Sequence, residues 1–413
     1  MRLGIVPGLQ RMNQFVYATG HPELKMGRVV LVGGTNGKGS TCAFLDSVLT
    51  GHGVRTVRFN SPHLSRFEER YLIQGCQASP KVLDQVAGQV FDIEKRWGIE
   101  LTGFELATAV AFLLFAEEAP EVAIVEVGMG GRLDATNVVN PALSIITPVA
   151  LDHMAFLGNT PEAIALEKAG IMRQGAPTIV AEQSPEVLAV LQESSRTVGA
   201  NAIFEDADFA ITSYPETPQS GWRLRSPSRQ WSIPKLGLFG KYQGHNALLA
   251  LIAAEILLGN DLDEGTVTKG LTEASWPGRF DRRRFEDTEI IFDGAHNPHA
   301  LEHLAQAVKE AGLAPLPVLY GAKADKDVDT ICRILPSFTN EVWLTTPPGI
   351  AAHDPVALGE RLAAHGVQVH VFEDPDEAFL AFARSDGATV RLCCGSLYLV
   401  GYLLRRFELS VVS

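Results

Sequence analysis

The sequence predicts an α/β protein with two domains. The first is a parallel-sheet domain with a small antiparallel excursion, and the second is a smaller α/β domain. Three observations lead to this prediction. Short apolar runs alternate with helical patterns through roughly the first 180 residues. A Pro-Gly break at Pro277-Gly278 is followed by a second alternation of the same kind. A glycine-rich stretch joins the first apolar run to the first helical pattern.

The predicted first domain takes its strands from short runs of β-branched and aliphatic residues, which suit buried strands. The strands are predicted at Val29–Val32, Thr56–Phe59, Val122–Val127, Leu143–Thr147 and Thr178–Ala181. Helices are predicted near Ser40–Thr50, Pro80–Trp97, Phe104–Ala116 and Pro161–Ala169. Strands that alternate with helices predict a parallel sheet covered by helices.

Residues 202–240 interrupt this alternation. They contain Pro, Ser and Trp residues and two short strand-like pieces, Trp222–Leu224 and Trp231–Ile233. We expect a small antiparallel excursion here. A long apolar helix near Asn246–Leu258 then closes the domain.

The second domain is predicted to follow Trp276–Arg279, because Pro and Gly together break both helix and strand. Its strands are predicted at Glu289–Phe292, Val318–Tyr320, Val342–Leu344, Val367–Phe372 and Val390–Cys393, with helices between them. This pattern is Rossmann-like. We therefore divide the chain into a first domain at 1–278, a linker at 279–288 and a second domain at 289–413.

Composition limits the classes of function. The formal net charge of −13 disfavours nonspecific nucleic-acid binding, which needs clustered positive charge. The five cysteines are odd in number and lack metal-ligand spacing, so we expect a reducing compartment. No apolar run reaches membrane-spanning length, and no signal-peptide pattern opens the chain. These features predict a cytoplasmic protein with no membrane or nucleic-acid partner.

The glycine-rich stretch Gly33–Thr41 follows the first predicted strand and opens the first predicted helix. That order wraps backbone N–H groups and a helix N-terminus around a phosphate. The first domain is therefore predicted to be of the P-loop type, with a nucleotide as its leading ligand. Gly39 separates Lys38 from Ser40, whereas the usual pattern has the hydroxyl directly after the lysine. An ordinary glycine-rich turn is the alternative.

Polar residues lie at the carboxyl ends of several predicted strands, the edge where open parallel sheets bind ligands. They include Ser61, Glu126 and His153 in the first domain and Asp293 in the second. Glu126 lies in an apolar strand, where a carboxylate is costly unless it is paired or binds a metal. An oxygen ligand of this kind suits Mg²⁺ that bridges ATP phosphates. A buried ion pair with a neighbouring cation is the alternative.

Other residues in the first domain have both a structural and a functional interpretation. Arg132 is either an anion ligand or a surface charge. Lys168 lies in the last turn of a predicted helix, where capping alone predicts a lysine. Thr102 and Glu105 fit a capping box, which would explain both residues without a ligand.

A polar turn, Asp293–Pro298, follows the first strand of the second domain. It is either an Asx-type turn with Asn297 as a helix N-cap, or a ligand site that Arg279 joins. The shared location of Asp293 and Arg279 in one predicted cleft favours the ligand site.

Taken together, these segments resemble the folylpolyglutamate synthases and the bifunctional dihydrofolate synthase/folylpolyglutamate synthases of the Mur ligase superfamily. The resemblance rests on Gly34–Thr41, Ser61–Leu64, Glu126–Asn137, Asp152-His153, Glu167–Ile171, Trp276–Arg279 and Asp293–Pro298. These segments occur in the family's order over nearly the whole chain. The resemblance implies a Mur ligase-like fold and an ATP-dependent ligase.

The reaction that the resemblance implies begins with a carboxylate of dihydropteroate or a reduced folate. This carboxylate takes the γ-phosphoryl group of ATP, and the amine of L-glutamate then displaces phosphate from the acyl phosphate. Mg²⁺ and Lys38 would offset the charge on the transferred group. Lys168 matches the lysine that the family carbamylates. Carbamylation turns a cation into an anion and needs a neutral amine.

The resemblance also implies a role for each matching residue. ATP binding falls to Asn36, Gly37, Lys38, Gly39, Ser40, Asn246, Arg279 and Asp293. Metal binding falls to Ser61, Glu126, His153 and carbamylated Lys168. Catalysis falls to Lys38, Lys168 and His296, and substrate binding to Thr102, Phe104, Glu105, Arg132, Leu133 and Ser396.

Two residues depart from the family's pattern. Gly34 replaces a common alanine, and Gly103 replaces a larger residue in the segment that faces the pterin. The second change bears on acceptor choice, so a monofunctional folylpolyglutamate synthase and a Mur-type ligase for another carboxylate are alternatives. A P-loop kinase or switch and a silent regulator fit less well. The polar turn at Asp293 argues against a kinase or switch. A silent regulator is disfavoured by the intact Lys38, Glu126, His153 and Lys168. We expect a monomer.

Overall fold

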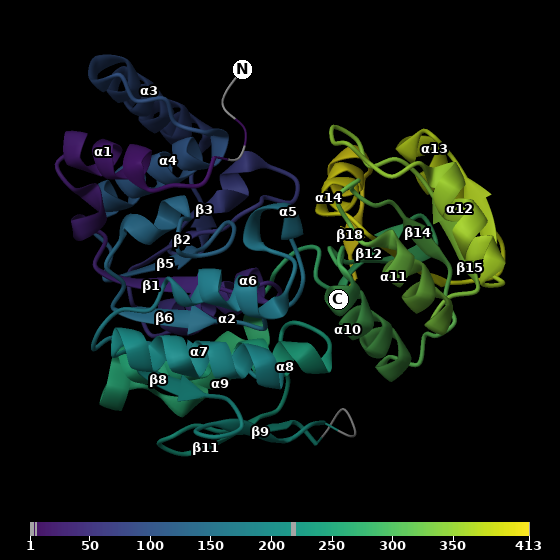
Figure 1. Cartoon of the computed structure of the whole chain (residues 1–413). Coiled ribbons are helices and arrows are strands. Elements are labelled where there is room, and N and C mark those ends of the chain that lie inside the picture. The colour runs from purple at the N-terminus through teal and green to yellow at the C-terminus, as the bar shows by residue number, and fades with distance from the viewer. Residues whose placement is uncertain (1–3, 5, 216–219, 413) are drawn as a thin grey trace. The chain divides into compact units, whose positions relative to one another are not determined.

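The computed structural model describes residues 4, 6–215 and 220–412. Its contacts divide the chain into two compact units (Figure 1). The first unit comprises Met1–His63, Phe67–Gly237 and Gln243–Ser275, and the second comprises Leu64–Arg66, Leu238–Tyr242 and Trp276–Ser413. Each unit has a large sheet of its own.

The first unit is built on an eight-stranded sheet with the strand order β4-β3-β2-β5-β1-β6-β7-β8. The strands are β1 (Arg28–Gly33), β2 (Thr56–Phe59), β3 (Tyr71–Ile73), β4 (Cys76–Gln77), β5 (Val122–Glu126), β6 (Leu143–Ile146), β7 (Pro177–Val180) and β8 (Asn201–Phe204). All pairs from β2 to β8 are parallel, and only the edge strands β3 and β4 pair in antiparallel fashion. The parallel-sheet prediction is confirmed.

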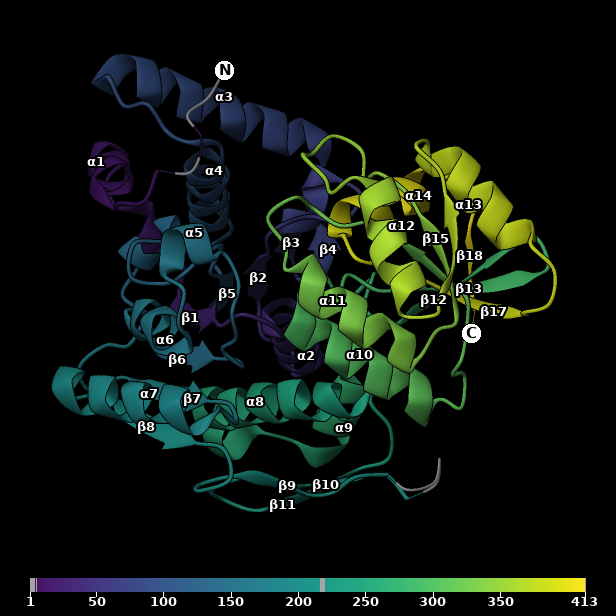
Figure 2. The same ribbon diagram turned by 45° about the vertical axis from the view of Figure 1, so that its right-hand side comes forward.

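Helices cover both faces of this sheet. They are α1 (Gln10–Ala18), α2 (Lys38–Gly51), α3 (Pro80–Trp97), α4 (Gly103–Glu118), α5 (Met154–Leu157), α6 (Pro161–Ala169), α7 (Pro185–Val198), α8 (Lys241–Leu258) and α9 (Glu264–Glu273). Figure 2 shows α4 and α2 on opposite sides of β1 and β5. Every residue of β5 is buried, as expected for a strand covered on both faces.

Two features of the first unit differ from the sequence-based prediction. β8 lies in the segment predicted as antiparallel, yet it pairs with β7 in parallel and extends the main sheet. Helix α8 begins at Lys241 rather than Asn246. Gly244 lies in the added first turn, where a Cβ would stand 2.1 Å from the Trp222 ring, so the glycine permits close packing.

The antiparallel excursion is confirmed in the rest of that segment. Strands β9 (Ala210–Ser213), β10 (Trp222–Arg225) and β11 (Gln230–Ile233) form a three-stranded antiparallel sheet in the order β11-β10-β9. Residues 216–219 of the predicted segment lie outside the described residues.

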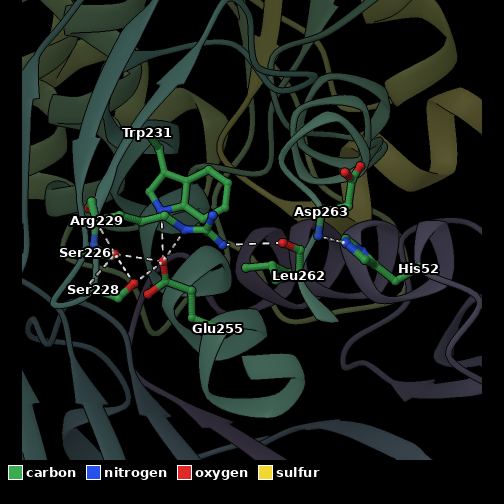
Figure 3. Close-up of polar contacts among 8 residues, drawn as sticks. All are labelled: His52, Ser226, Ser228, Arg229, Trp231, Glu255, Leu262 and Asp263. Carbon is green, nitrogen blue, oxygen red and sulfur yellow. Dashed lines mark hydrogen bonds and ion pairs between the residues drawn. The ribbon is translucent and has the colours of Figure 1, made fainter. Parts of the chain in front are cut away.

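A polar cluster anchors the small sheet to α8 (Figure 3). The Glu255 carboxylate accepts hydrogen bonds from Ser226 Oγ at 2.7 Å, Ser228 Oγ at 3.0 Å and Trp231 Nε1 at 2.8 Å. The Arg229 guanidinium lies 4.0 Å from the centre of the Trp231 ring. Because these donors converge on one carboxylate, the cluster is explained by its role in holding the small sheet on α8.

The second unit has a seven-stranded sheet in the order β16-β15-β14-β17-β13-β12-β18. Its strands are β12 (Asp281–Phe285), β13 (Thr288–Phe292), β14 (Val318–Tyr320), β15 (Glu341–Leu344), β16 (Gln368–Val371), β17 (Val390–Cys394) and β18 (Ser410–Val411). Its helices are α10 (Pro298–Glu310), α11 (Val328–Ile334), α12 (Pro355–Ala364), α13 (Pro375–Arg384) and α14 (Leu397–Arg406). Helices α10–α12 pack in one apolar cluster, and α13 and α14 pack in another.

The segment 279–288, predicted as a linker, contains strand β12, which pairs with β13 in antiparallel fashion. Its sequence, Asp-Arg-Arg-Arg-Phe, hides this strand because four of its five residues are charged. The side chains alternate between half-buried and exposed, which suits a strand near the sheet edge that β18 covers for only two residues.

None of the described helices is long and apolar enough to cross a membrane.

Candidate active site

The glycine-rich loop connects β1 to α2, as predicted, and two of its glycines have a steric reason. Gly37 is the N-cap of α2 with φ 91°, and Gly34 has φ 138°. Both values favour glycine. A Cβ on Gly34 would stand 1.8 Å from Thr147 Oγ1. The hydroxyl of Thr147 therefore explains why alanine is absent here.

The first N–H groups of the loop bond to the protein itself. Thr35 N and Asn36 N both donate to the Pro148 carbonyl, at 2.9 and 3.3 Å. Thr35 Oγ1 also exchanges hydrogen bonds with the backbone of Ala150, at 3.0 Å each way. The donors for an anion must therefore come from the first turn of α2, whose N–H groups have no partner within the helix.

Asn246 lies over the loop. A Cβ on Gly37 would stand 2.3 Å from Asn246 Oδ1, and Asn246 Nδ2 donates to Gln243 Oε1 at 2.9 Å. The structure therefore brings the predicted ATP ligand of α8 to the predicted phosphate loop.

Two lysines meet at one carbonyl of the loop. Lys168 Nζ donates to Gly34 O at 2.7 Å, and Lys38 Nζ donates to Gly34 O at 3.2 Å and to Thr35 O at 3.1 Å. Lys168 is 3% exposed. Burial and, to a smaller extent, the charge of Lys38 lower the pKa of Lys168 to about 7. The capping alternative is wrong, because the amine donates to the loop rather than to the end of its own helix.

Glu126 is the last residue of β5 and is 5% exposed. Its Oε2 atom accepts hydrogen bonds from Asn60 Nδ2 at 2.9 Å and from Ser61 N at 3.1 Å. No lysine, arginine or histidine in the described parts of the chain forms an ion pair with it, so the ion-pair alternative is wrong. Asn60 was not among the predicted site residues, although a polar residue directly after a buried strand was a usable signal.

The second oxygen distinguishes Glu126 from the other buried carboxylates of the described chain. In five of them, both oxygens accept hydrogen bonds or join an ion pair within the protein: Asp46, Glu105, Asp134, Glu205 and Asp293. In Glu23, the second oxygen is fully buried without a partner. Oε1 of Glu126 has no partner among the described residues and is not among the fully buried atoms, so it is available to a ligand.

His153 has φ 51°, in the left-handed region that is unusual for a residue with a Cβ. Its backbone N–H donates to Asp152 Oδ1 at 2.8 Å. Strained backbone of this kind concentrates at functional sites. Within the described residues, no three His, Cys, Asp or Glu side chains converge as a metal-binding group. The predicted metal set contains only Glu126 and His153 of these types, which fits Mg²⁺ because this ion keeps several waters.

The predicted capping box at the start of α4 is present. Thr102 Oγ1 accepts from Glu105 N, and Glu105 Oε2 accepts from Thr102 N at 2.8 Å. The Glu105 carboxylate also accepts from Arg11 Nε at 2.8 and 3.0 Å. Both oxygens of Glu105 are therefore engaged within the protein, and its predicted substrate contact stays a prediction.

Phe104 lies against the end of β5. A Cβ on Gly128 would stand 2.4 Å from the Phe104 ring, and the ring is partly buried beside Phe59. Arg132 pairs with Glu167 of α6 at 2.6 Å, and Leu133 follows in a turn. A short segment connects Glu126, at the end of β5, to this turn. Arg132 and Leu133, two of the predicted substrate contacts, therefore lie close to Glu126 in sequence.

In the second unit, the polar turn has the Asx-type geometry that was the alternative to a ligand site. Asp293 accepts hydrogen bonds from Phe280 N and Ala295 N, both at 2.8 Å, and Asn297 caps α10 by accepting from Ala300 N. Burial raises the pKa of Asp293, and the charge of Arg279 opposes this shift. The structure therefore brings Arg279 and Asp293 close together.

His296 and Ser396 lie on two loops that pair with each other. His296 Nδ1 lies 2.8 Å from the Gly294 carbonyl, and it donates to this oxygen. Ser396 caps α14 and accepts from Tyr398 N at 3.2 Å. Gly395 N donates to Ala295 O, which joins the two loops.

Comparison with known proteins matches this architecture. Residues 32–254 match the family described as Mur ligase middle domain, and residues 278–397 match Mur ligase, glutamate ligase domain. The loop, the two sheets and these matches define a Mur-type ligase.

Three relatives indicate which family of Mur-type ligases this chain resembles. The dihydrofolate synthase/folylpolyglutamate synthase of Bacillus subtilis is 32% identical over 99% of this chain and 96% of its own length. E. coli FolC in complex with DHPP and ADP has a TM-score of 0.87 at 31% identity, over 98% of this chain and 94% of that chain. A bifunctional folylpolyglutamate synthase/dihydrofolate synthase with Mn, AMPPNP and L-glutamate bound has a TM-score of 0.86 at 31% identity, over 98% and 95%.

The chain belongs to the dihydrofolate synthase/folylpolyglutamate synthase family of Mur ligases. The predicted fold class, family and enzyme class, an ATP-dependent ligase, are thereby confirmed. The roles of individual site residues stay predictions.

Proposed function

We propose that this protein joins L-glutamate to dihydropteroate, to reduced folates or to both, with ATP as co-substrate. The acceptor carboxylate attacks the γ-phosphorus, ADP leaves, and an acyl phosphate forms. The glutamate amine then attacks the acyl carbon, phosphate leaves, and the amine loses a proton as the amide forms. The observation that carries the proposal is the meeting of Lys38 and Lys168 at one carbonyl of the phosphate loop.

The residues of the first unit have distinct tasks in this proposal. The first turn of α2 binds phosphate through backbone N–H groups, and Lys38 offsets negative charge on the transferred phosphoryl group. Asn246 orients the nucleotide above Gly37. Phe104 offers an aromatic surface to the ring system of the acceptor.

Ser61, Glu126 and His153 would hold Mg²⁺, because Oε1 of Glu126 has no partner among the described residues. When bound, this ion neutralises phosphate charge. We also propose that Lys168 reacts with CO₂ as a neutral amine, losing one proton and becoming a carbamate anion. The burial of Lys168 and its low pKa support this modification.

In the second unit, we propose that Arg279 and Asp293 contact ATP, and that His296 and Ser396 serve the glutamate. The junction of the His296 loop with the Ser396 loop supports this assignment. We further propose a monomer in the cytoplasm. The free state of all five cysteines supports a reducing compartment.

The test is ADP release by purified protein with ATP, Mg²⁺ and L-glutamate, with dihydropteroate and tetrahydrofolate added separately. We expect turnover with at least one acceptor and none without. Activity with tetrahydrofolate alone would identify a monofunctional folylpolyglutamate synthase. Lys38→Ala should abolish the signal, and Lys95→Ala, at an exposed lysine of α3, should leave it unchanged. Glutamate-dependent turnover without either acceptor would overturn the proposal.

A further inference from the structure

Asn60, the residue directly after β2, has an unusual hydrogen-bonding environment. Its side chain is 1% exposed. Nδ2 donates to Glu126 Oε2 at 2.9 Å, whereas Oδ1 is fully buried and has no partner among the described residues. A buried carbonyl oxygen without a donor costs about 1–3 kcal/mol.

The orientation of this amide follows from its neighbour. If the amide were turned over, Oδ1 would face the Glu126 carboxylate, and two acceptors would repel each other. The bond to Glu126 therefore fixes the amide, at the cost of an unpartnered oxygen. Because Asn60 carries this energetic cost, its bond to Glu126 should serve a function.

The effect on Glu126 is directional. Asn60 Nδ2 and Ser61 N both bond Oε2, so this oxygen is turned into the protein and Oε1 is left for a ligand. Both donors are neutral amides, which hold the carboxylate without cancelling its charge. Arg58, two residues earlier on the same strand, instead pairs with Asp46 at 3.3 Å.

We infer that Asn60 is a positioning residue for divalent-cation binding: its amide holds Glu126 in one orientation through Oε2 and leaves Oε1 without a partner among the described residues. This inference rests on the proposed role of Glu126 as a ligand of Mg²⁺. Asn60 itself has no atom free for the ion, because Oδ1 is fully buried.

The test is a titration of Mn²⁺ into the protein with AMPPNP, followed by electron paramagnetic resonance of free Mn²⁺. The Asn60→Asp variant keeps the shape but replaces the donor with a repelling oxygen, and Asn60→Ala removes the donor. We expect the Kd for Mn²⁺ to rise about 10-fold or more in both, as for other residues that orient metal ligands. ADP binding in EDTA should stay within about two-fold of wild type, since the phosphate donors are intact.

Val57→Ala is the matched control. Val57 is a buried residue of the same strand, β2, and carries no donor to Glu126, so the substitution disturbs the same region without removing a hydrogen bond to the carboxylate. This variant should bind Mn²⁺ like wild type. Thermal unfolding identifies folded variants, and Asn60→Ala decides the question if Asn60→Asp does not fold.

Glu126→Gln separates the two hypotheses. If it weakens Mn²⁺ binding while folded Asn60 variants bind like wild type, the positioning role is wrong and the ligand role stands. If Glu126→Gln also binds Mn²⁺ like wild type, the ligand role of Glu126 is wrong, and the inference about Asn60 is overturned with it.

Discussion

Burial of Lys168 should make the stability of the protein depend on pH, and substitution of this lysine should remove that dependence. The pKa of Lys168 is lowered from 10.5 to about 7, mainly by burial and then by Lys38. Between these two values the unfolded chain binds one proton more than the native protein. The contribution of Lys168 to the free energy of unfolding should therefore rise with pH over this range and be flat below pH 7.

The size of the effect follows from the shift. One pKa unit corresponds to about 1.4 kcal/mol, so the slope should be about 1.4 kcal/mol per pH unit. From pH 7.5 to 9.5 this gives about 3 kcal/mol. The same shift makes the amine about 90% neutral at pH 8, against about 0.3% for an ordinary lysine. The supply of neutral amine for reaction with CO₂ is therefore about 300-fold larger.

The assay is urea unfolding of wild type and Lys168→Met at pH 7.5, 8.5 and 9.5, in buffers freed of CO₂. The difference between the two proteins should change by the predicted slope, because methionine fills the site without a titrating group. Lys95→Met, at an exposed lysine, corrects for general effects of a lost charge. Bicarbonate should then stabilise wild type but not Lys168→Met, since a carbamate anion would lie beside Lys38.

Parallel pH curves for wild type and Lys168→Met would refute the argument, because they would mean that Lys168 titrates alike in the native and unfolded states. A normal pH slope without a bicarbonate effect would keep the burial argument and remove the carbamate. The two conclusions are thus tested independently.

Other substitutions give further predictions. Gly37→Ala should weaken ADP binding by about 10-fold or more in calorimetry, because the methyl group would stand 2.3 Å from Asn246 Oδ1 in a strained backbone. Gly53→Ala, at φ 77° in open space, carries the strain alone and should bind ADP normally. Glu255→Ala should lower the free energy of unfolding by about 3 kcal/mol, since three donors lose their acceptor, and retention of wild-type stability would contradict this. Glu105→Gln should lose about 1–3 kcal/mol of stability with an unchanged acceptor KM, whereas a raised KM alone would restore its predicted substrate role.

The sequence predicted the main strands well because burial on both faces leaves long apolar runs. β5 is buried throughout and was predicted to within one residue. β12 was missed for the opposite reason, since its half-exposed side chains carry charges that resemble a linker. The direction of β8 was also not predictable, because a strand of four residues reveals neither its partner nor its orientation.

Site residues were predictable where chemistry restricts residue type, and less so where geometry decides between two uses of one residue. Glu126 stood out as a carboxylate in an apolar strand. Lys168 and Glu105 each fitted a helix-end pattern, yet the fold engages Glu105 within the protein and directs Lys168 into the phosphate loop. That outcome depends on Arg11 and Gly34, which are distant in sequence and were not predictable as partners.

The position of Ser40 in the phosphate loop bears on which hydroxyl is available to a metal ion. The usual pattern places a serine or threonine directly after the lysine, where it binds the metal ion. Here Gly39 intervenes, and Ser40 is only 3% exposed. Ser61 is partly exposed, and its backbone donates to the carboxylate whose other oxygen is free. The accessible hydroxyl and the accessible carboxylate oxygen thus come from the ends of β2 and β5, which are neighbours in the sheet. This arrangement favours Ser61 over Ser40 as the hydroxyl that meets the cation.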